Sequence, residues 1–300
     1  MENKFFAPFK SLSWQEKMDY VNTYANFARL YGIRLVDFAK GYAALTMTIS
    51  PQHWNSQKRL HGGWSAGLAV IASEYASWSY GHNVQVTSLS INYYKGVAQG
   101  ELLITAREKH FDGLFMVFDI EINTNDQEHI LVAGATVSVL CLPVDIEWHL
   151  QPQPSYPREQ ARPLPVWPKR QYALDQEVLG LRPSFKRSDW GGKMEYLNET
   201  ENFYYTEDIR LTHYEAGRAC IEFAPLKKQH MGPDGNLDPA WVAILVDQLI
   251  GKASLYNGEF NVTAQTSINF YEIENQECKA GDKILGRSAG EKPQRCFQPV

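Results

Sequence analysis

Hydrophobic and polar residues alternate along several short stretches of the chain, and this period of two predicts β-strands. The alternation is clear at 42–47, and similar stretches predict strands at 84–94, 101–109, 114–123 and 130–142. Asp112-Gly113, between two of these stretches, favours a hairpin turn. Two longer apolar segments, 64–78 and 239–256, predict helices. Asp238 suits the N-cap of the second helix, and Pro239 suits its first turn.

The predicted elements occur twice in the same order. Three short blocks return 176 or 177 positions later in the chain. The blocks are Ile33-Arg34-Leu35 with Ile209-Arg210-Leu211, Trp64 with Trp241, and Ser90-Ile91-Asn92 with Ser267-Ile268-Asn269. Weak matches that keep one order and a nearly constant spacing indicate an internal duplication. We therefore predict two tandem copies of one α+β unit, each a central helix wrapped by an antiparallel sheet.

Proline marks the joint between the two copies, because seven of the 15 prolines lie between 143 and 168. Such a segment neither continues a helix nor pairs as a central strand. We predict an N-terminal unit at 1–143, a proline-rich linker at 144–175 and a C-terminal unit at 176–300. About 50 residues follow Asn92 before the linker, whereas about 30 follow Asn269. The second unit is therefore expected to lack its last strand.

Composition excludes several classes of function. The formal net charge is -5 and no block of Lys or Arg stands out, so no nucleic-acid partner is expected. The first residues do not read as a secretory signal, and no apolar stretch reaches the roughly 18 residues of a membrane span. The four cysteines are dispersed without metal-ligand spacing, which favours reduced thiols, a cytoplasmic location and no bound metal.

The segment 55–74 carries the most specific chemistry, with Asn55 six residues before His61-Gly62-Gly63. Glycines at the start of a helix let a ligand approach backbone N–H groups at the positive end of the helix dipole. A lone motif of this kind is more often a tight turn beside a loop histidine. With its flanking residues, however, the segment resembles the phenylacetate-pathway and THEM2-like hotdog thioesterases, and the two-copy layout also resembles acyl-CoA thioesterase II.

The resemblance implies a double hotdog that hydrolyses acyl-CoA, with coenzyme A only as part of the substrate and no other cofactor. It implies that Gly62 and Asn55 polarise the thioester, with His61, Gly63 and Trp64 beside the substrate, although an aromatic residue such as Trp64 is more often core. The chain would be a monomeric pseudo-dimer or a higher homo-oligomer.

The family also places an Asp nine residues after the His, and a Ser or Thr five residues before the Ile of the Ser-Ile-Asn strand. The first copy has Val70 and Val86 at these positions, whereas the second has Asp247 and Thr263. The two copies therefore complement each other, and we expect one catalytic site shared between them. Burial in an apolar helix is expected to raise the pKa of Asp247, as suits a general base.

Two alternatives stay open from the sequence. Glu74 lies one helical turn after position 70 and is a rival base or substrate contact, although the sequence somewhat favours a helix-end carboxylate near solvent. A non-catalytic protein that binds acyl-CoA or another acyl ligand is the second alternative, because duplication frees a site to decay. The thioesterase II type also uses a Gln in the strand that is expected to be missing here.

Overall fold

The computed structural model describes residues 11–55, 58–142, 183–200, 209–227, 230–232, 237–255, 263–270, 284–288 and 297–299. The predicted linker at 144–175 lies outside the described residues and stays a prediction. Cys278 and Cys296 also lie outside the described residues. Of the cysteines that are described, Cys141 and Cys220 are both free thiols.

The first part of the chain forms a helix wrapped by a sheet. Its helices are α1 (Trp14–Tyr24), α2 (Asn26–Leu30) and α3 (Gly62–Trp78), with a 3-10 turn η2 at Pro51–His53. Its strands are β1 (Arg34–Ala39), β2 (Tyr42–Thr48), β3 (Val84–Tyr93), β4 (Glu101–Phe111), β5 (Phe115–Thr124) and β6 (Leu131–Cys141). All neighbouring strands are antiparallel, in the order β1-β2-β4-β5-β6-β3. The strands predicted from alternation are confirmed to within two residues.

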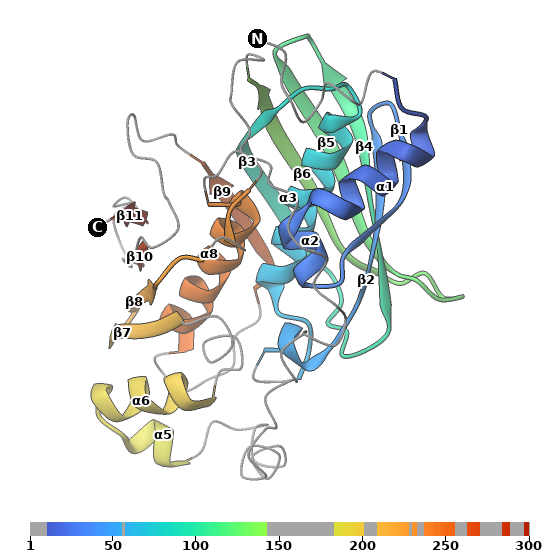
Figure 1. Ribbon diagram of the computed structural model, residues 1–300. Helices are drawn as coiled ribbons and strands as arrows, with labels where there is room; N and C mark the ends of the chain where they lie inside the picture. Colours follow the sequence, from blue (N-terminus) through green and yellow to red (C-terminus); the bar gives the residue numbers. More distant parts are fainter. Residues whose placement is uncertain are drawn as a thin grey trace.

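Helix α3 is buried almost all round, as expected for a helix that is apolar on every side and packs under a sheet (Figure 1). It begins at Gly62, two residues before the predicted start. The reason is that His61 is the N-cap, so both glycines belong to the first turn of the helix.

The second part of the chain contains α5 (Pro183–Arg187), α6 (Trp190–Thr200) and α8 (Pro239–Ser254). Its strands are β7 (Ile209–Glu215), β8 (Arg218–Phe223), β9 (Gln265–Asn269), β10 (Ile284–Arg287) and β11 (Phe297–Pro299). Four of these strands form a second sheet in the order β11-β10-β8-β7. Helix α8 has the predicted cap, since the Asp238 side chain accepts a hydrogen bond from the Ala240 N–H at 2.9 Å.

The two parts meet through strands and through helices. Strand β9 extends the first sheet by pairing antiparallel with β3, with Ser90 opposite Ser267 (Figure 1). Helices α3 and α8 pack directly against each other (Figure 1). A Cβ atom added to Gly67 would lie 3.2 Å from the Ile244 side chain, and one added to Gly63 would lie 2.9 Å from the Ile244 carbonyl oxygen. The helix pair therefore packs closely only because these positions lack side chains.

Several details of local structure recur at the spacing of the sequence repeat. The Asn22 side chain makes two hydrogen bonds to the backbone of Leu35, and the Asn198 side chain makes the same two to Leu211. Gly41 and Gly217 both turn their hairpins with φ of 69°. Isolated bridges also match, joining Trp54 to Leu60 and Met231 to Leu237. Both parts of the chain thus use one local design.

The second sheet is smaller than the first. Strand β10 pairs with β8 as β4 pairs with β2, and β11 pairs with β10 as β5 pairs with β4. Within the described residues, no strand has the place that β6 has between β5 and β3. The expectation of a missing last strand in the second unit stays a prediction.

Candidate active site

The N-terminus of α3 meets a carboxylate from α8. Asp247 is buried, with 3% of its surface exposed. Its Oδ2 atom accepts a hydrogen bond from the Gly63 N–H at 2.8 Å, and it lies 3.0 Å from His61 Nδ1. Residues 184 positions apart in the sequence are therefore brought together at a helix start.

The other carboxylate oxygen of Asp247 is left available. Oδ1 is buried and has no hydrogen-bond partner within the described part of the chain. A Cβ atom added to Gly62 would lie 3.1 Å from each of the two carboxylate oxygens. The absence of a side chain at Gly62 thus keeps open the space in front of the carboxylate.

The pKa of Asp247 is lowered from its ordinary value, which corrects the expectation from the sequence. Burial by itself raises this pKa, but the charge and hydrogen bond of His61 oppose it. The Gly63 N–H and the Thr263 side chain lower the pKa further. The sequence shows the burial of Asp247 but not these partners, which stabilise the ionised form. Asp247 is therefore a carboxylate at neutral pH.

The first N–H groups of α3 have distinct roles. The Gly63 N–H is engaged by Asp247 and lies 3.0 Å from His61 Nδ1. The Gly62 N–H comes first in the helix, where no intrahelical acceptor exists. Of the two glycines, Gly62 therefore offers the donor that can polarise a carbonyl oxygen, assisted by the helix dipole.

Asn55 shapes the loop before the helix. Its side-chain Oδ1 accepts a hydrogen bond from the Arg59 N–H at 3.2 Å, and its backbone N–H donates to the Arg59 carbonyl at 2.8 Å. The side chain therefore closes the 55–59 loop. Its expected contact with a thioester stays a prediction.

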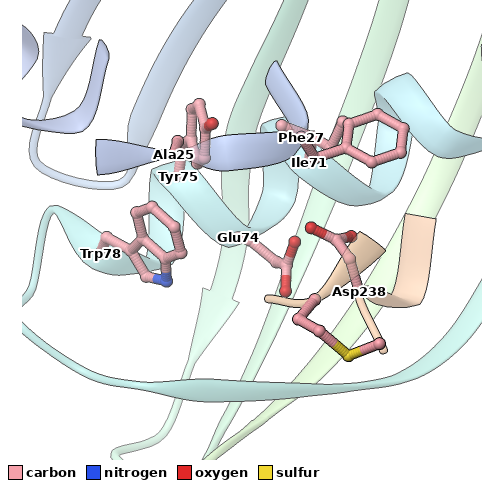
Figure 2. Close-up of a pocket in the computed structure, with 8 residues that line it drawn as sticks. Ala25, Phe27, Ile71, Glu74, Tyr75, Trp78 and Asp238 are labelled. Carbon is pink, nitrogen blue, oxygen red and sulfur yellow. The ribbon is translucent and has the colours of Figure 1, made fainter. Parts of the chain in front are cut away.

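Glu74 and Trp64 are not brought to Asp247. Glu74 follows Gly63 by three turns of α3, a rise of roughly 16 Å, and it lines a small cavity with Asp238 (Figure 2). Trp64 is a core residue with 2% of its surface exposed, in edge-on contact with Tyr31. Val70 and Val86, the counterparts of Asp247 and Thr263, are also buried in the core.

Tyr93 belongs to the site although its sequence position did not suggest it. Its hydroxyl donates a hydrogen bond to the Gly62 carbonyl at 3.2 Å and so braces the first turn of α3. Burial and the negative charge of Asp247 raise the pKa of Tyr93, which stays protonated as a donor. The repeat carried a signal, because the matching residue of the second copy is Phe270, which has no hydroxyl.

The similarity to known proteins covers the part of the chain that contains the start of α3. The model of the Thioesterase superfamily matches residues 57–130. The acyl-coenzyme A thioesterase PaaI of Escherichia coli (strain K12) is 32% identical over 104 residues, which cover 34% of this chain and 74% of that protein. The chain belongs to the thioesterase superfamily. It is an enzyme of the thioester hydrolase class, and its first unit has the hotdog fold of this family.

Two solved structures of the superfamily are similar to the chain. The structure of PaaI from E. coli is 26% identical with a TM-score of 0.41, and the match covers 44% of this chain and 98% of that one. Zebrafish thioesterase superfamily member 2 is 20% identical with a TM-score of 0.41, covering 44% of this chain and 99% of that one.

The described ranges contain neither a metal centre nor a membrane-spanning helix. No group of three or more His, Cys, Asp or Glu side chains there is placed to hold a metal ion. Among the same residues, no helix combines the length and the hydropathy that crossing a membrane requires.

Proposed function

We propose that this thioesterase hydrolyses acyl-CoA at a single site shared between two hotdog units of one chain. The observation that carries the proposal is the Asp247 carboxylate. It is buried and ionised, one oxygen has no partner within the described residues, and it faces the first turn of α3. An unpaired carboxylate oxygen in a dry setting is unfavourable unless it is used.

The contacts between the two parts support a tandem pseudo-dimer. Ser90 pairs with Ser267, its own copy 177 positions later. Leu89 pairs with the copy of Ile91, and Ile91 pairs with the copy of Leu89. Gly67 packs against Ile244, which is again its own copy. Self-complementary contact of this kind is what a two-fold interface requires.

The arrangement supports a mechanism in which both units act on one thioester. The carbonyl oxygen of the thioester binds the Gly62 N–H at the start of α3, which stabilises the oxyanion that forms on attack. Tyr93 holds this turn through the Gly62 carbonyl. His61 and Gly63 fix Asp247 through one of its oxygens. Oδ1 is thereby left to face the carbonyl carbon or a water molecule.

The lowered pKa of Asp247 favours direct attack over general-base catalysis, because a base is most effective when its pKa lies near the working pH. Oδ1 forms a bond to the carbonyl carbon, and the carbon–sulfur bond breaks. Coenzyme A leaves as a thiolate and takes a proton from water. Water then hydrolyses the mixed anhydride, which releases the fatty or aromatic acid and restores the carboxylate.

The test is a hydrolysis screen over acyl-CoA thioesters of short, long and aromatic acyl groups. We expect Asp247→Asn to lower kcat by about a hundredfold or more while the circular dichroism spectrum is retained. Glu74→Gln is the matched control, since it neutralises a carboxylate at the other end of α3, and it should keep kcat within a few-fold of the wild type.

Near-wild-type turnover by Asp247→Asn would contradict the proposal. Loss in Glu74→Gln alone would move the chemistry to the other end of the helix. Binding of acyl-CoA without turnover by the wild type would instead favour the non-catalytic acyl-binding alternative.

A further inference from the structure

One small cavity shows which side chains of α3 are directed toward the segment that precedes α8. It is lined from α3 by Ile71, Glu74, Tyr75 and Trp78, and from the second unit by Met231 and Asp238 (Figure 2). Its volume of about 20 Å³ holds a single water, so it is too small for an acyl group. Ile71 and Tyr75 therefore face the segment that precedes α8.

The repeat maps this face onto the other end of the helix pair. Gln248 and Lys252 of α8 lie 177 positions after Ile71 and Tyr75. Trp54 and His61 lie 177 positions before Met231 and Asp238, which line the small cavity. Gln248 and Lys252 thus face the segment that includes His61, whose ring is in contact with Asp247. This inference rests on the function proposed above, with the acyl chain on this side of Asp247.

Gln248 carries an unmet requirement for hydrogen bonds. It is 1% exposed, and neither its Oε1 nor its Nε2 has a hydrogen-bond partner within the described part of the chain. The corresponding residue of the first unit, Ile71, has no such requirement. Lys252 is also buried, but it already takes part in an interaction within the protein. The buried amide is therefore the group that is left for a ligand.

We infer that Gln248 binds a polar group on the acyl chain and sets the substrate preference of the enzyme. A carboxamide offers one acceptor and a donor side by side, so it is satisfied by a neutral group that both donates and accepts a hydrogen bond. A hydroxyl group on the acyl chain meets this requirement, whereas a carboxylate satisfies only the donor. The substrates are then hydroxyacyl thioesters rather than unsubstituted or dicarboxylic ones.

The test compares matched thioesters in the full-length protein. Butanoyl-CoA is compared with 3-hydroxybutanoyl-CoA, hexanoyl-CoA with 6-hydroxyhexanoyl-CoA, and succinyl-CoA serves as the anionic probe. We expect kcat/KM to favour a hydroxylated member by about tenfold to a hundredfold, as one well-placed buried hydrogen-bonding group allows. Gln248→Ile, which copies the first unit, and Gln248→Met, which keeps the volume, should both remove this preference. Ile250→Gln, on the exposed side of α8, is the control and should retain it.

A second measurement separates this inference from the proposed function. Calorimetry should show the same preference for the hydroxylated member among non-hydrolysable thioethers of coenzyme A. The pairs to compare are S-butyl with S-(3-hydroxybutyl) and S-hexyl with S-(6-hydroxyhexyl). A wild type that binds the hydroxylated thioethers more tightly but hydrolyses no thioester would overturn the proposed function and support the inference. Equal ratios in wild type and both Gln248 variants, or a preference for succinyl-CoA, would overturn the inference.

Discussion

The Gly63 N–H lies within reach of two acceptors at the start of α3. It is 2.8 Å from Asp247 Oδ2 and 3.0 Å from His61 Nδ1. Asp247 Oδ2 accepts the hydrogen bond from Gly63, and the same oxygen lies 3.0 Å from His61 Nδ1. His61 thus acts as a clamp on the carboxylate, whereas the family resemblance implied only a place beside the substrate.

Replacing His61 by Asn tests this clamp. Asn is a good N-cap and keeps a hydrogen-bonding side chain, but it carries no charge. Removing the ring removes the strongest influences that lower the pKa of Asp247 and leaves burial, which raises it. A carboxylate that must be ionised loses activity below its pKa, so the acidic limb of the kcat/KM profile should move to higher pH.

The measurement is kcat/KM for one thioester from pH 8 down to about pH 3, because the pKa of Asp247 in the wild type lies below its ordinary value. His110→Asn is the control, because His110 is exposed beside Asp112 and remote in sequence from this helix start. An acidic limb at the same pH in His61→Asn and in the wild type would show that His61 does not hold the pKa of Asp247.

For single residues, the sequence predicted which side chains belong to the candidate site better than it predicted the contacts that they make there. Asp247 was predictable because a carboxylate in an otherwise apolar helix needs a purpose, and the repeat showed Val70 in its place. Its pKa direction and the use of the Asn55 side chain within its own loop were not predictable. The pKa of Asp247 depends on partners from distant parts of the chain, and Asn55 bonds to Arg59 within an irregular loop that has no sequence signature.

The loop before α3 is organised by a second buried imidazole. His53, in η2, is 1% exposed, and its Nδ1 accepts a hydrogen bond from the Ser50 N–H at 3.0 Å. Its ring packs edge-on against Trp64 at 4.7 Å between centroids. Burial lowers the pKa of His53 to about 3, so the ring is neutral in the folded protein. This element holds the entry to the active-site helix.

Protonation of His53 should therefore weaken the fold in acid. The unfolded chain binds a proton near the ordinary pKa of 6.5, whereas the folded chain resists it down to about 3. The free energy of unfolding should fall as the pH drops through this window, by up to about 1.4 kcal/mol per pH unit from this one group. His53→Asn keeps an acceptor for Ser50 but cannot titrate, so urea unfolding should show a lower stability at pH 7 and a flatter pH dependence. An equally steep dependence in that variant would assign the acid sensitivity to other groups.

The long elements were predictable and the short ones were not. Alternation in the strands and the apolar run of α3 locate these elements to within two residues, because one buried face controls the pattern. Helices α1 and α6 were not predicted, because each buries one residue among its described side chains, Val21 in α1 and Leu197 in α6. An Asn side chain holds each helix to a neighbouring strand, and so does the edge-on contact of Trp14 with Phe38 or of Trp190 with Tyr214. The start of α3 was placed two residues late because His61 is an uncommon N-cap.

For the molecule as a whole, the order of matching blocks predicted a repeated unit, but the contact between the units required the structure. The repeat gives no indication that Gly67 lies against its own copy, Ile244. This position lies where the proposed two-fold axis crosses the helix pair. At this point the first unit has a glycine and the second has a large side chain. The Ile244 side chain therefore occupies the space between the helices that Gly67 leaves open.

Exchanging the two residues tests the pseudo-dimer and its single site together. Gly67→Ile alone should overfill the contact and cost about 1–3 kcal/mol, and Ile244→Gly alone should leave a cavity that costs about 2–5 kcal/mol. The double variant restores one large and one absent side chain across the axis, so it should be more stable than the sum of the single effects by at least about 1 kcal/mol.

Urea unfolding measures the coupling. Thioester turnover should fall in the single variants and recover in the double variant, because Gly63 and Asp247 meet across the same helix contact. Strictly additive destabilisation would mean that the two side chains do not compete for one space, and the packing at Gly67 and Ile244 would then give no support to a two-fold contact.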